Sequence, residues 1–155
     1  MGTFKLWGIG LVVVFAAGCD EHEHGAEPGD DACEHLEGGP VVPVTAGTSE
    51  SAPLLASSHT RYDIALGAER TVKVPIGEAA EYYFFFASTV SLVVKDADGA
   101  VVVAEAAGSS DEHCDLVGAW FTYDLGVGTY TLEVTAPGEA TGAQLVYFEA
   151  GGHEH

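Results

Sequence analysis

The feature that most constrains this chain is a series of short apolar runs, about ten residues apart, between Val41 and Glu149. Each run is rich in β-branched, aromatic or other apolar residues and is bounded by Gly, Pro, Asp or Ser, which is the pattern of strands separated by turns. The predicted strands are 41–45, 60–66, 71–76, 81–87, 90–95, 100–105, 117–125, 128–135 and 143–149. This spacing favours a sandwich or barrel over alternating βαβ units.

The individual runs differ in which faces they bury. Residues 61–66 and 71–76 alternate between apolar and polar, so each predicts one buried and one wet face. Tyr82–Phe86 is apolar on both faces, which is typical of a central strand, although an aromatic strip can also form a platform for sugars. Turn residues at Asp96–Gly99 and at Gly126–Gly128 predict two hairpins.

The β-rich part, residues 41–149, is long enough for one domain and too short for two. No long helical pattern follows residue 18. We therefore expect an all-β fold, a single antiparallel β-sandwich of the jelly-roll or immunoglobulin-like kind with about eight or nine strands.

Part of this region resembles a known family. The run Glu81–Val94, the turn Asp96–Gly99, then Cys114, Tyr123–Leu125 and Gly128–Val134, is similar to bacterial pre-peptidase C-terminal domains. Those domains are small jelly-roll-like sandwiches attached to secreted proteins. The resemblance covers about half of the chain, implies the fold class and implies no active site.

The first 18 residues have the three parts of a bacterial export signal. Lys5 supplies a positive charge, Ile9–Ala17 supplies a short apolar core, and small residues lead up to Cys19. The apolar core is shorter than the about 20 residues that a membrane-spanning helix needs. We interpret residues 1–18 as a cleaved signal peptide.

The four residues Ala16-Ala17-Gly18-Cys19 resemble the lipobox of bacterial lipoproteins, with Ala16 where the common lipobox has Leu. The resemblance implies cleavage before Cys19 and acylation of this cysteine, palmitate being a usual chain. Acyl chains of this kind anchor a protein stably in a lipid bilayer. The expected location is the bacterial cell envelope, facing the periplasm or the surface, with inner or outer membrane open. The alternatives are an ordinary secretory signal and an uncleaved anchor.

Charge narrows the choice of partners. Removal of residues 1–18 takes away Lys5 and no acid, so 24 acidic and 4 basic residues remain, a formal net charge of −20. Such a chain is not expected to bind nucleic acid, whose phosphates require Lys and Arg. Cations and basic proteins are its natural partners, and the charge also keeps an exported domain soluble.

Residues 19–40 carry many acids, Gly and Pro, three His and almost nothing apolar, so we expect a disordered tether. Acylation of Cys19 leaves Cys33 and Cys114, in a compartment that permits disulfides. Their pairing would close a loop of about 80 residues, which would stabilise the fold by about 4 kcal/mol. The alternative is that both cysteines are metal thiolates.

Histidine is the enriched functional residue. The two ends of the mature chain mirror each other as Glu21-His22-Glu23-His24 and as His153-Glu154-His155, the latter within the tail 150–155. Imidazole and carboxylate suit Zn²⁺, Ni²⁺ or Cu²⁺, so His22, His24, His153 and His155 are predicted to bind such metals weakly. The alternative is a solvated acidic tail with incidental His.

A second His group is predicted to be ordered. Cys33-Glu34-His35 and Glu112-His113-Cys114 bring the same residue types together, and a disulfide would carry His35 and His113 towards each other. With His59 as a third ligand, they would form a metal site with one open position. The alternative is that these His residues are exposed beside a structural disulfide.

Enzyme signatures are absent: the chain has no Gly-x-Ser-x-Gly, no phosphate-binding loop and no His-Glu-x-x-His. We therefore expect a non-catalytic binding domain, with a divalent transition metal (Zn, Ni or Cu) as the leading ligand. The alternative is an interaction or structural module that docks another envelope protein and has no metal role.

Overall fold

The computed structural model describes residues 27–151, in which strands dominate. One helix, α1 (Pro28–Gly38), precedes the strands. The strands are β1 (Val41–Thr45), β2 (Arg61–Ala65), β3 (Thr71–Ile76), β4 (Ala80–Phe86), β5 (Ser91–Lys95), β6 (Val101–Val102), β7 (Ala106–Gly108), β8 (Ala119–Leu125), β9 (Gly128–Thr135) and β10 (Gly142–Glu149). Every predicted run contains a strand, while β7 has no counterpart among the predictions.

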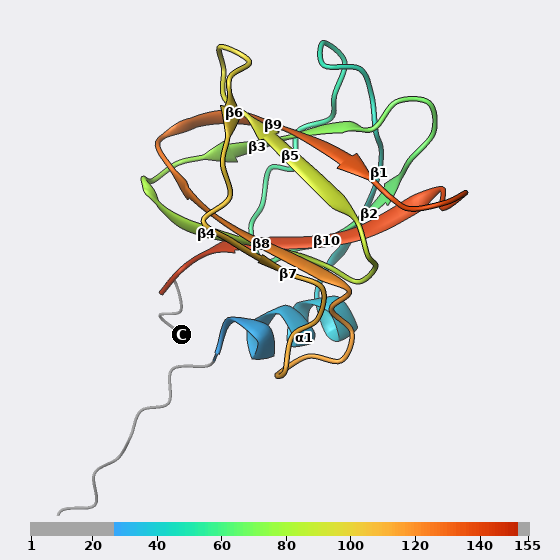
Figure 1. The fold of residues 1–155 in the computed structure, drawn as a ribbon, viewed down its shortest axis with the longest axis vertical. Helices are drawn as coiled ribbons and strands as arrows, with labels where there is room; N and C mark the ends of the chain where they lie inside the picture. Colours follow the sequence, from blue (N-terminus) through green and yellow to red (C-terminus); the bar gives the residue numbers. More distant parts are fainter. Residues whose placement is uncertain (1–26, 152–155) are drawn as a thin grey trace, which may run out of the picture.

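The strands form two facing sheets, which confirms the all-β, sandwich-like fold (Figure 1). One sheet has the order β1-β2-β10-β4-β8-β7 and the other has the order β3-β9-β5-β6. Helix α1 lies outside the six-stranded sheet and forms a third layer. No helix within residues 27–151 combines the length and hydrophobicity needed to cross a bilayer.

The expectation of a purely antiparallel sandwich is wrong at one edge, because β1 and β2 are parallel. Parallel neighbours need a long crossover connection, which residues 46–60 provide. This connection reaches the other sheet, where Gly47 bridges to Thr71 and Leu54 bridges to Lys73 of β3. The crossover therefore joins both sheets along the edge of the sandwich.

The two predicted hairpins have different outcomes. Asp96–Gly99 does join β5 to β6: Gly99 has a φ of 80°, and Asp96 Oδ1 accepts hydrogen bonds from the N–H groups of Asp98 and Ala100 at 3.0 and 2.9 Å. The prediction for Gly126–Gly128 is wrong, because β8 and β9 belong to different sheets. Strand β8 is already paired on both sides, with β4 and β7, so it offers no edge to β9.

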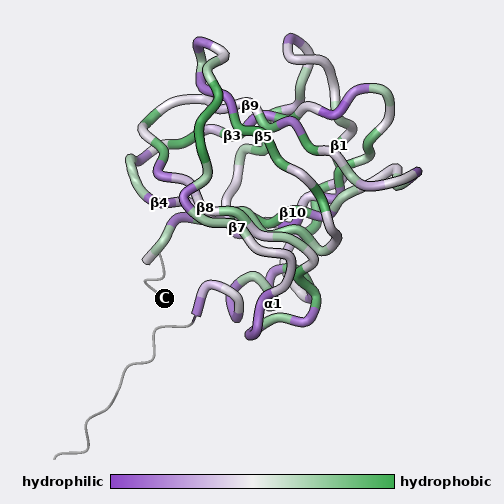
Figure 2. Tube along the Cα trace, in the orientation of Figure 1, coloured by the Kyte–Doolittle hydropathy of each residue, from purple (hydrophilic) through white to green (hydrophobic). Residues whose placement is uncertain are grey.

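The main core lies between the sheets and contains the inward side chains of β4, β9 and β10. Phe84 and Phe86 are fully buried there, and Phe84 stacks on Tyr147 of β10. The most hydrophobic segments follow the strands, whereas α1 and the turns carry most of the hydrophilic residues (Figure 2). The prediction that residues 82–86 form a central strand is confirmed, since β4 lies between β10 and β8.

A second, smaller core lies on the outer face of the six-stranded sheet, under α1. Ala32 and Leu36 of α1 are buried there with Phe85 of β4 and with Val146 and Phe148 of β10. This layer explains why β4 is apolar on both faces: one face meets the main core and the other meets the helix.

The expected disorder of residues 19–40 is therefore wrong for residues 28–38, while 19–26 lie outside the described residues. Pro28 begins the helix and Asp30 and Asp31 occupy its first turn, as helix N-termini favour. Ala32 and Leu36, four residues apart, lie on one face and supply its apolar contact with the sheet. Tertiary packing offsets a composition that is unfavourable by itself.

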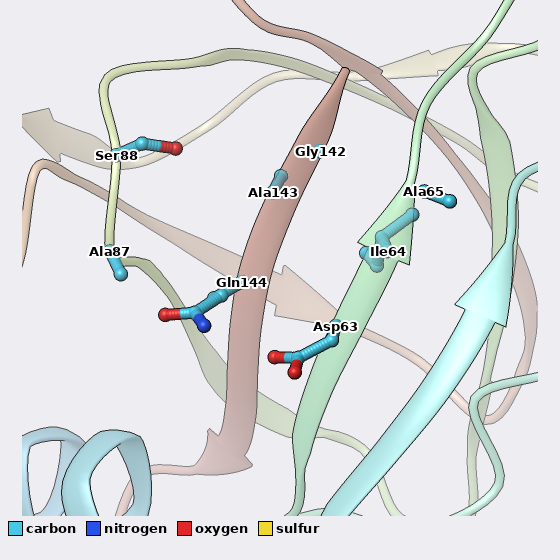
Figure 3. Close-up of a pocket in the computed structure, with 8 residues that line it drawn as sticks. All are labelled: Asp63, Ile64, Ala65, Ala87, Ser88, Gly142, Ala143 and Gln144. Atoms are coloured by element: carbon cyan, nitrogen blue, oxygen red, sulfur yellow. The ribbon is translucent and has the colours of Figure 1, made fainter. Parts of the chain in front are cut away.

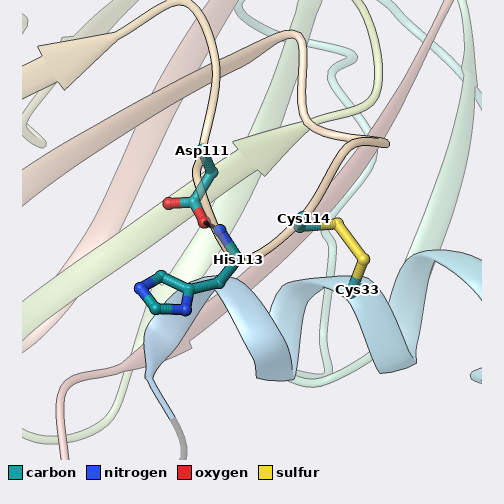
Figure 4. The surroundings of a disulfide bond; sticks show 4 residues. All are labelled: Cys33, Asp111, His113 and Cys114. Atoms are coloured by element: carbon teal, nitrogen blue, oxygen red, sulfur yellow. Dashed lines mark hydrogen bonds between the residues drawn. A yellow bond between two sulfur atoms is a disulfide. The ribbon is translucent and has the colours of Figure 1, made fainter.

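A disulfide joins Cys33 of α1 to Cys114 in the loop before β8, as predicted, so neither cysteine is a metal thiolate (Figure 4). The Cα atoms are 5.3 Å apart, and the two cysteines have a sequence separation of 81. Cys114 is buried in the smaller core. The helix is thus fixed covalently as well as by packing.

We predict that replacing both Cys33 and Cys114 by Ser lowers the free energy of unfolding by about 4 kcal/mol, because the unfolded chain regains the entropy of an open loop. Urea unfolding monitored by tryptophan fluorescence measures this difference. A reductant should destabilise the parent protein and leave the double variant unchanged. Equal stability of parent and variant would show that packing alone holds α1.

Candidate functional site

His59 is held rigidly just before β2. Its backbone has a φ of 54°, in the left-handed region, and its N–H donates to the Tyr147 carbonyl at 3.0 Å. Its ring stacks on Phe148 with centroids 5.1 Å apart and planes 8° from parallel. The surroundings therefore fix both the backbone and the ring of this histidine.

His35 lies in the last turn of α1 and meets His59 directly. Nε2 of His35 is 3.2 Å from Nδ1 of His59, and both side chains are half-buried. In the hydrogen-bonded pair one nitrogen donates and the other accepts, so the two rings take complementary tautomers. The same end of the helix is held by Arg61, whose Nη1 donates to the Leu36 carbonyl at 2.8 Å.

His113 does not join this pair. It is exposed in the loop before β8, where its Nε2 lies 3.4 Å from Glu112 and its backbone N–H donates to Asp111 Oδ1 at 2.9 Å. Its ring points away from the disulfide (Figure 4). The disulfide holds this loop to α1 without bringing His113 into hydrogen-bonding contact with His35.

The structure thus brings together two of the three histidines predicted to form an ordered site. Across residues 27–151, no group of three or more His, Cys, Asp or Glu side chains converges in a way that could hold a metal ion. This part of the chain therefore offers at most the two imidazoles of His35 and His59 at one place. Cys19, the predicted lipidation site, and the terminal histidines His22, His24, His153 and His155 lie outside the described residues.

An open pocket of about 500 Å³ lies on the outer face of the six-stranded sheet. Asp63 of β2 and Gln144 of β10 lie beside each other on neighbouring strands, and Ala87 and Ser88 line the other side (Figure 3). Ile64 and the small residues Ala65, Gly142 and Ala143 complete its wall. Asp63 Oδ1 is 3.2 Å from Nε of Arg61, so its charge is partly neutralised.

The aromatic strip does not form an exposed platform. Tyr82 and Phe85 are buried, and Tyr83 is half-buried among Phe85 and Phe148. Burial, together with a hydrogen bond to Glu81, raises the pKa of Tyr83 to about 12. The strip therefore serves mainly as packing surface.

Three carboxylates lie close together near the start of β4. Glu81 pairs with Asp124 of β8 in register, and Glu105 lies beside both. Hydrogen bonding to Glu81, followed by burial and by the charges of Glu81 and Asp124, raises the pKa of Glu105 above its usual value. After the hydrogen bond and burial, the negative charges of Glu81 and Asp124 also disfavour the ionised form of Glu105.

Sequence reasoning missed α1, which carries His35, and therefore missed what covers the second face of the sheet. A signal was present: residues 82–86 and 145–148 are continuously apolar, and such strands require a layer on each side. Ala32 and Leu36 are the apolar residues spaced to supply that layer. The acidic residues around Ala32 and Leu36 in the sequence obscured this helical spacing.

No known family model matches this sequence, and no curated protein matches it.

We predict that Glu105→Gln raises the melting temperature at neutral pH. The pKa of Glu105 is higher in the folded than in the unfolded state, so its stabilising contribution is present when it is protonated and is lost as pH rises through the raised pKa. The amide removes that loss, so the gain should shrink as pH falls to about 4. Thermal unfolding at both pH values measures it. Glu139→Gln, on an exposed connection, is the matched control, and an equal gain there would contradict the assignment to the cluster.

Proposed function

We propose that this protein is an exported, lipid-anchored component of the bacterial cell envelope whose sandwich is a non-catalytic binding domain. Its ligand in this proposal is a divalent transition metal, Zn²⁺, Ni²⁺ or Cu²⁺, held by His35 and His59. The single observation that supports the choice of metal is the 3.2 Å separation of the two imidazole nitrogens. We further propose that the sandwich has the jelly-roll topology of pre-peptidase C-terminal domains.

The separation suits a shared metal ion. Two nitrogens that each bind Zn²⁺ at about 2.0–2.1 Å lie about 3.3 Å apart at the tetrahedral angle. The stacking of His59 on Phe148 and the position of His35 on a fixed helix hold the two ligands in place. The ordering cost that weakens binding by flexible ends is therefore small here.

The remaining ligands come from water or from the chain ends. His22 and His24 precede α1, and His153 and His155 follow β10. In this proposal the ends collect metal from solution, and the ordered pair retains it. With few protein ligands the affinity is modest, as suits reversible uptake and release.

We predict that His59→Ala abolishes one equivalent of metal binding. The parent for this test is the full-length protein in neutral detergent, with His22, His24, His153 and His155 changed to Asn so that the ends contribute nothing. Calorimetric titration with Zn²⁺, Ni²⁺ and Cu²⁺ should show one saturable site, lost in His35→Ala and in His59→Ala. At a metal concentration 100 times the dissociation constant, binding should stabilise the fold by about 2.7 kcal/mol.

His113→Ala is the matched control, because this histidine is exposed and lies outside the pair. It should leave the titration unchanged. If binding persists in His59→Ala, or is absent from the parent, the metal proposal is wrong.

The second candidate is an interaction or structural module that docks another envelope protein and has no metal role. The observation in its favour is the open pocket lined by Asp63, Gln144 and small residues on the outer sheet face. It is supported if metal has no effect while mild crosslinking in whole cells yields one partner, and if Gln144→Trp, which fills the pocket, removes that crosslink.

Anchoring is tested separately. We predict that Cys19→Ser moves the protein from the membrane fraction to the soluble fraction and removes incorporation of radiolabelled palmitate, because the thiol that carries the acyl chains is lost. Cell fractionation and metabolic labelling measure the two effects. Unchanged labelling in the variant would contradict the lipoprotein proposal.

A further inference from the structure

A small pocket of about 210 Å³ lies where α1 begins and where the chain leads back towards Cys19. Three aromatic residues, Tyr83, Phe85 and Trp120, and three acidic residues, Glu27, Asp111 and Glu112, line it. It is separate from the His35–His59 pair, which lies at the other end of the helix. Apolar ring surface and negative charge thus meet in one concave site.

The aromatic wall is built by the register of the sheet. Phe85 of β4 pairs with Trp120 of β8, so their side chains project on the same outer face, with Tyr83 next along the strand. The Trp120 indole N–H donates to the Ser110 carbonyl at 3.0 Å, which orients the ring. A Cβ added to Gly108 would lie 2.4 Å from the indole nitrogen, so the absence of a side chain there makes room for the ring.

In the acidic wall, Asp111 is held in place, while Glu112 is exposed and lies 3.4 Å from His113 Nε2. Asp111 accepts a hydrogen bond from the His113 backbone and packs against Gly29 of α1, where a Cβ would lie 1.9 Å from its carboxylate. Glu112 is exposed beside it, and Glu27 precedes the helix. The described residues that line the pocket include no Lys and no Arg, and His113 is the one group there that can become cationic.

Acidic groups near Tyr83 also act on its hydroxyl. The charges of Glu81 and Glu27 contribute to the raised pKa of Tyr83, after burial and its hydrogen bond to Glu81. The positive end of the α1 dipole opposes a cation, and Asp30 and Asp31 in the first turn offset it.

We propose that this pocket binds a small organic ammonium cation, with the ammonium group against the rings of Tyr83 and Trp120 and its charge balanced by Asp111 and Glu112. Aromatic rings attract cations through their quadrupole, and cages of rings and carboxylates recognise quaternary ammonium groups. An alkylammonium needs apolar contact as well as charge, which distinguishes it from a metal ion. This chain offers no convergent set of three metal ligands within residues 27–151.

The ammonium group has two possible sources, a free amine and a lipid headgroup. Glu27 is the eighth residue after Cys19. At full extension this stretch spans at most about 29 Å, so an acylated Cys19 would keep the pocket close to the bilayer surface. The headgroup source rests on the anchoring proposed above, whereas binding of a free amine does not, so the two can fail independently.

The test uses the full-length protein in neutral detergent, titrated with choline, with ethanolamine and with 3,3-dimethylbutanol, the uncharged isostere of choline. Calorimetry should show saturable binding of choline that weakens as salt rises and no binding of the isostere. Equal binding of the isostere, or no saturable binding of either amine, would overturn the proposal.

Variants locate the site. Tyr83→Leu should weaken choline binding by about 2- to 5-fold and Tyr83→Phe should preserve it, because the ring and not the hydroxyl makes the contact. Glu112→Gln should weaken binding without affecting folding, since its side chain is exposed. Glu139→Gln, outside the pocket, is the control. The assignment to this pocket is wrong if Glu112→Gln binds choline as tightly as the parent and the Glu139→Gln control do, and if a folded Tyr83→Leu variant does so too.

To distinguish a lipid headgroup from a free amine, the choline titration is repeated with vesicles of phosphatidylglycerol that contain or lack phosphatidylcholine. Competition by the mixed vesicles alone assigns the site to a headgroup, and the absence of competition assigns it to a free amine. Both outcomes retain the ammonium site. An unlabelled Cys19→Ser protein that still binds choline would leave this inference standing even if anchoring failed.

Discussion

The contact on which the structure depends is the burial of the outer face of β4 and β10 beneath α1. Phe85, Val146 and Phe148 would be exposed to water without Ala32 and Leu36 above them. At about 25 cal/mol per Å² of apolar surface, burial of such side chains gains about 1.5–3 kcal/mol each. The disulfide then limits how far the helix can separate from the sheet. Helix α1 therefore covers part of the outer face of the six-stranded sheet. The His35–His59 pair and the aromatic pocket lie at the two ends of this helix.

Strand positions were predictable because local patterns determine them. Alternation in β2 and β3, the apolar run in β4 and the Asp96–Gly99 turn each act within a few residues, and all appear where the sequence placed them. Which strands pair was harder to predict from the sequence, because pairing depends on which strand edges are already bonded to other strands. Gly126–Gly128 looks like a hairpin locally, yet β8 has both neighbours, so the chain crosses to the other sheet.

The candidate site was predictable only in part, for a similar reason. The Cys33–Cys114 pairing was predicted from the number of cysteines and from the expected export of the chain, and the structure contains it. The meeting of His35 with His59 depends on a helix whose stability comes from tertiary contacts, and on a crossover that returns the chain beside it. His113 is next to Cys114 in sequence, but its side chain points away from the disulfide. Adjacency along the chain did not determine direction in space.

The position of the disulfide also determines how tension is transmitted. A pull on the anchor proposed at Cys19 would reach the domain through the first half of α1 and pass at Cys33 directly into Cys114. Residues 34–113, which include β1 to β7, lie inside the closed covalent loop and are bypassed by this force. The covalent path would instead run through the chain up to Cys33 and continue from Cys114 towards β8. Under the proposed anchoring, the His35–His59 contact would therefore lie outside the covalent path of a force applied at Cys19.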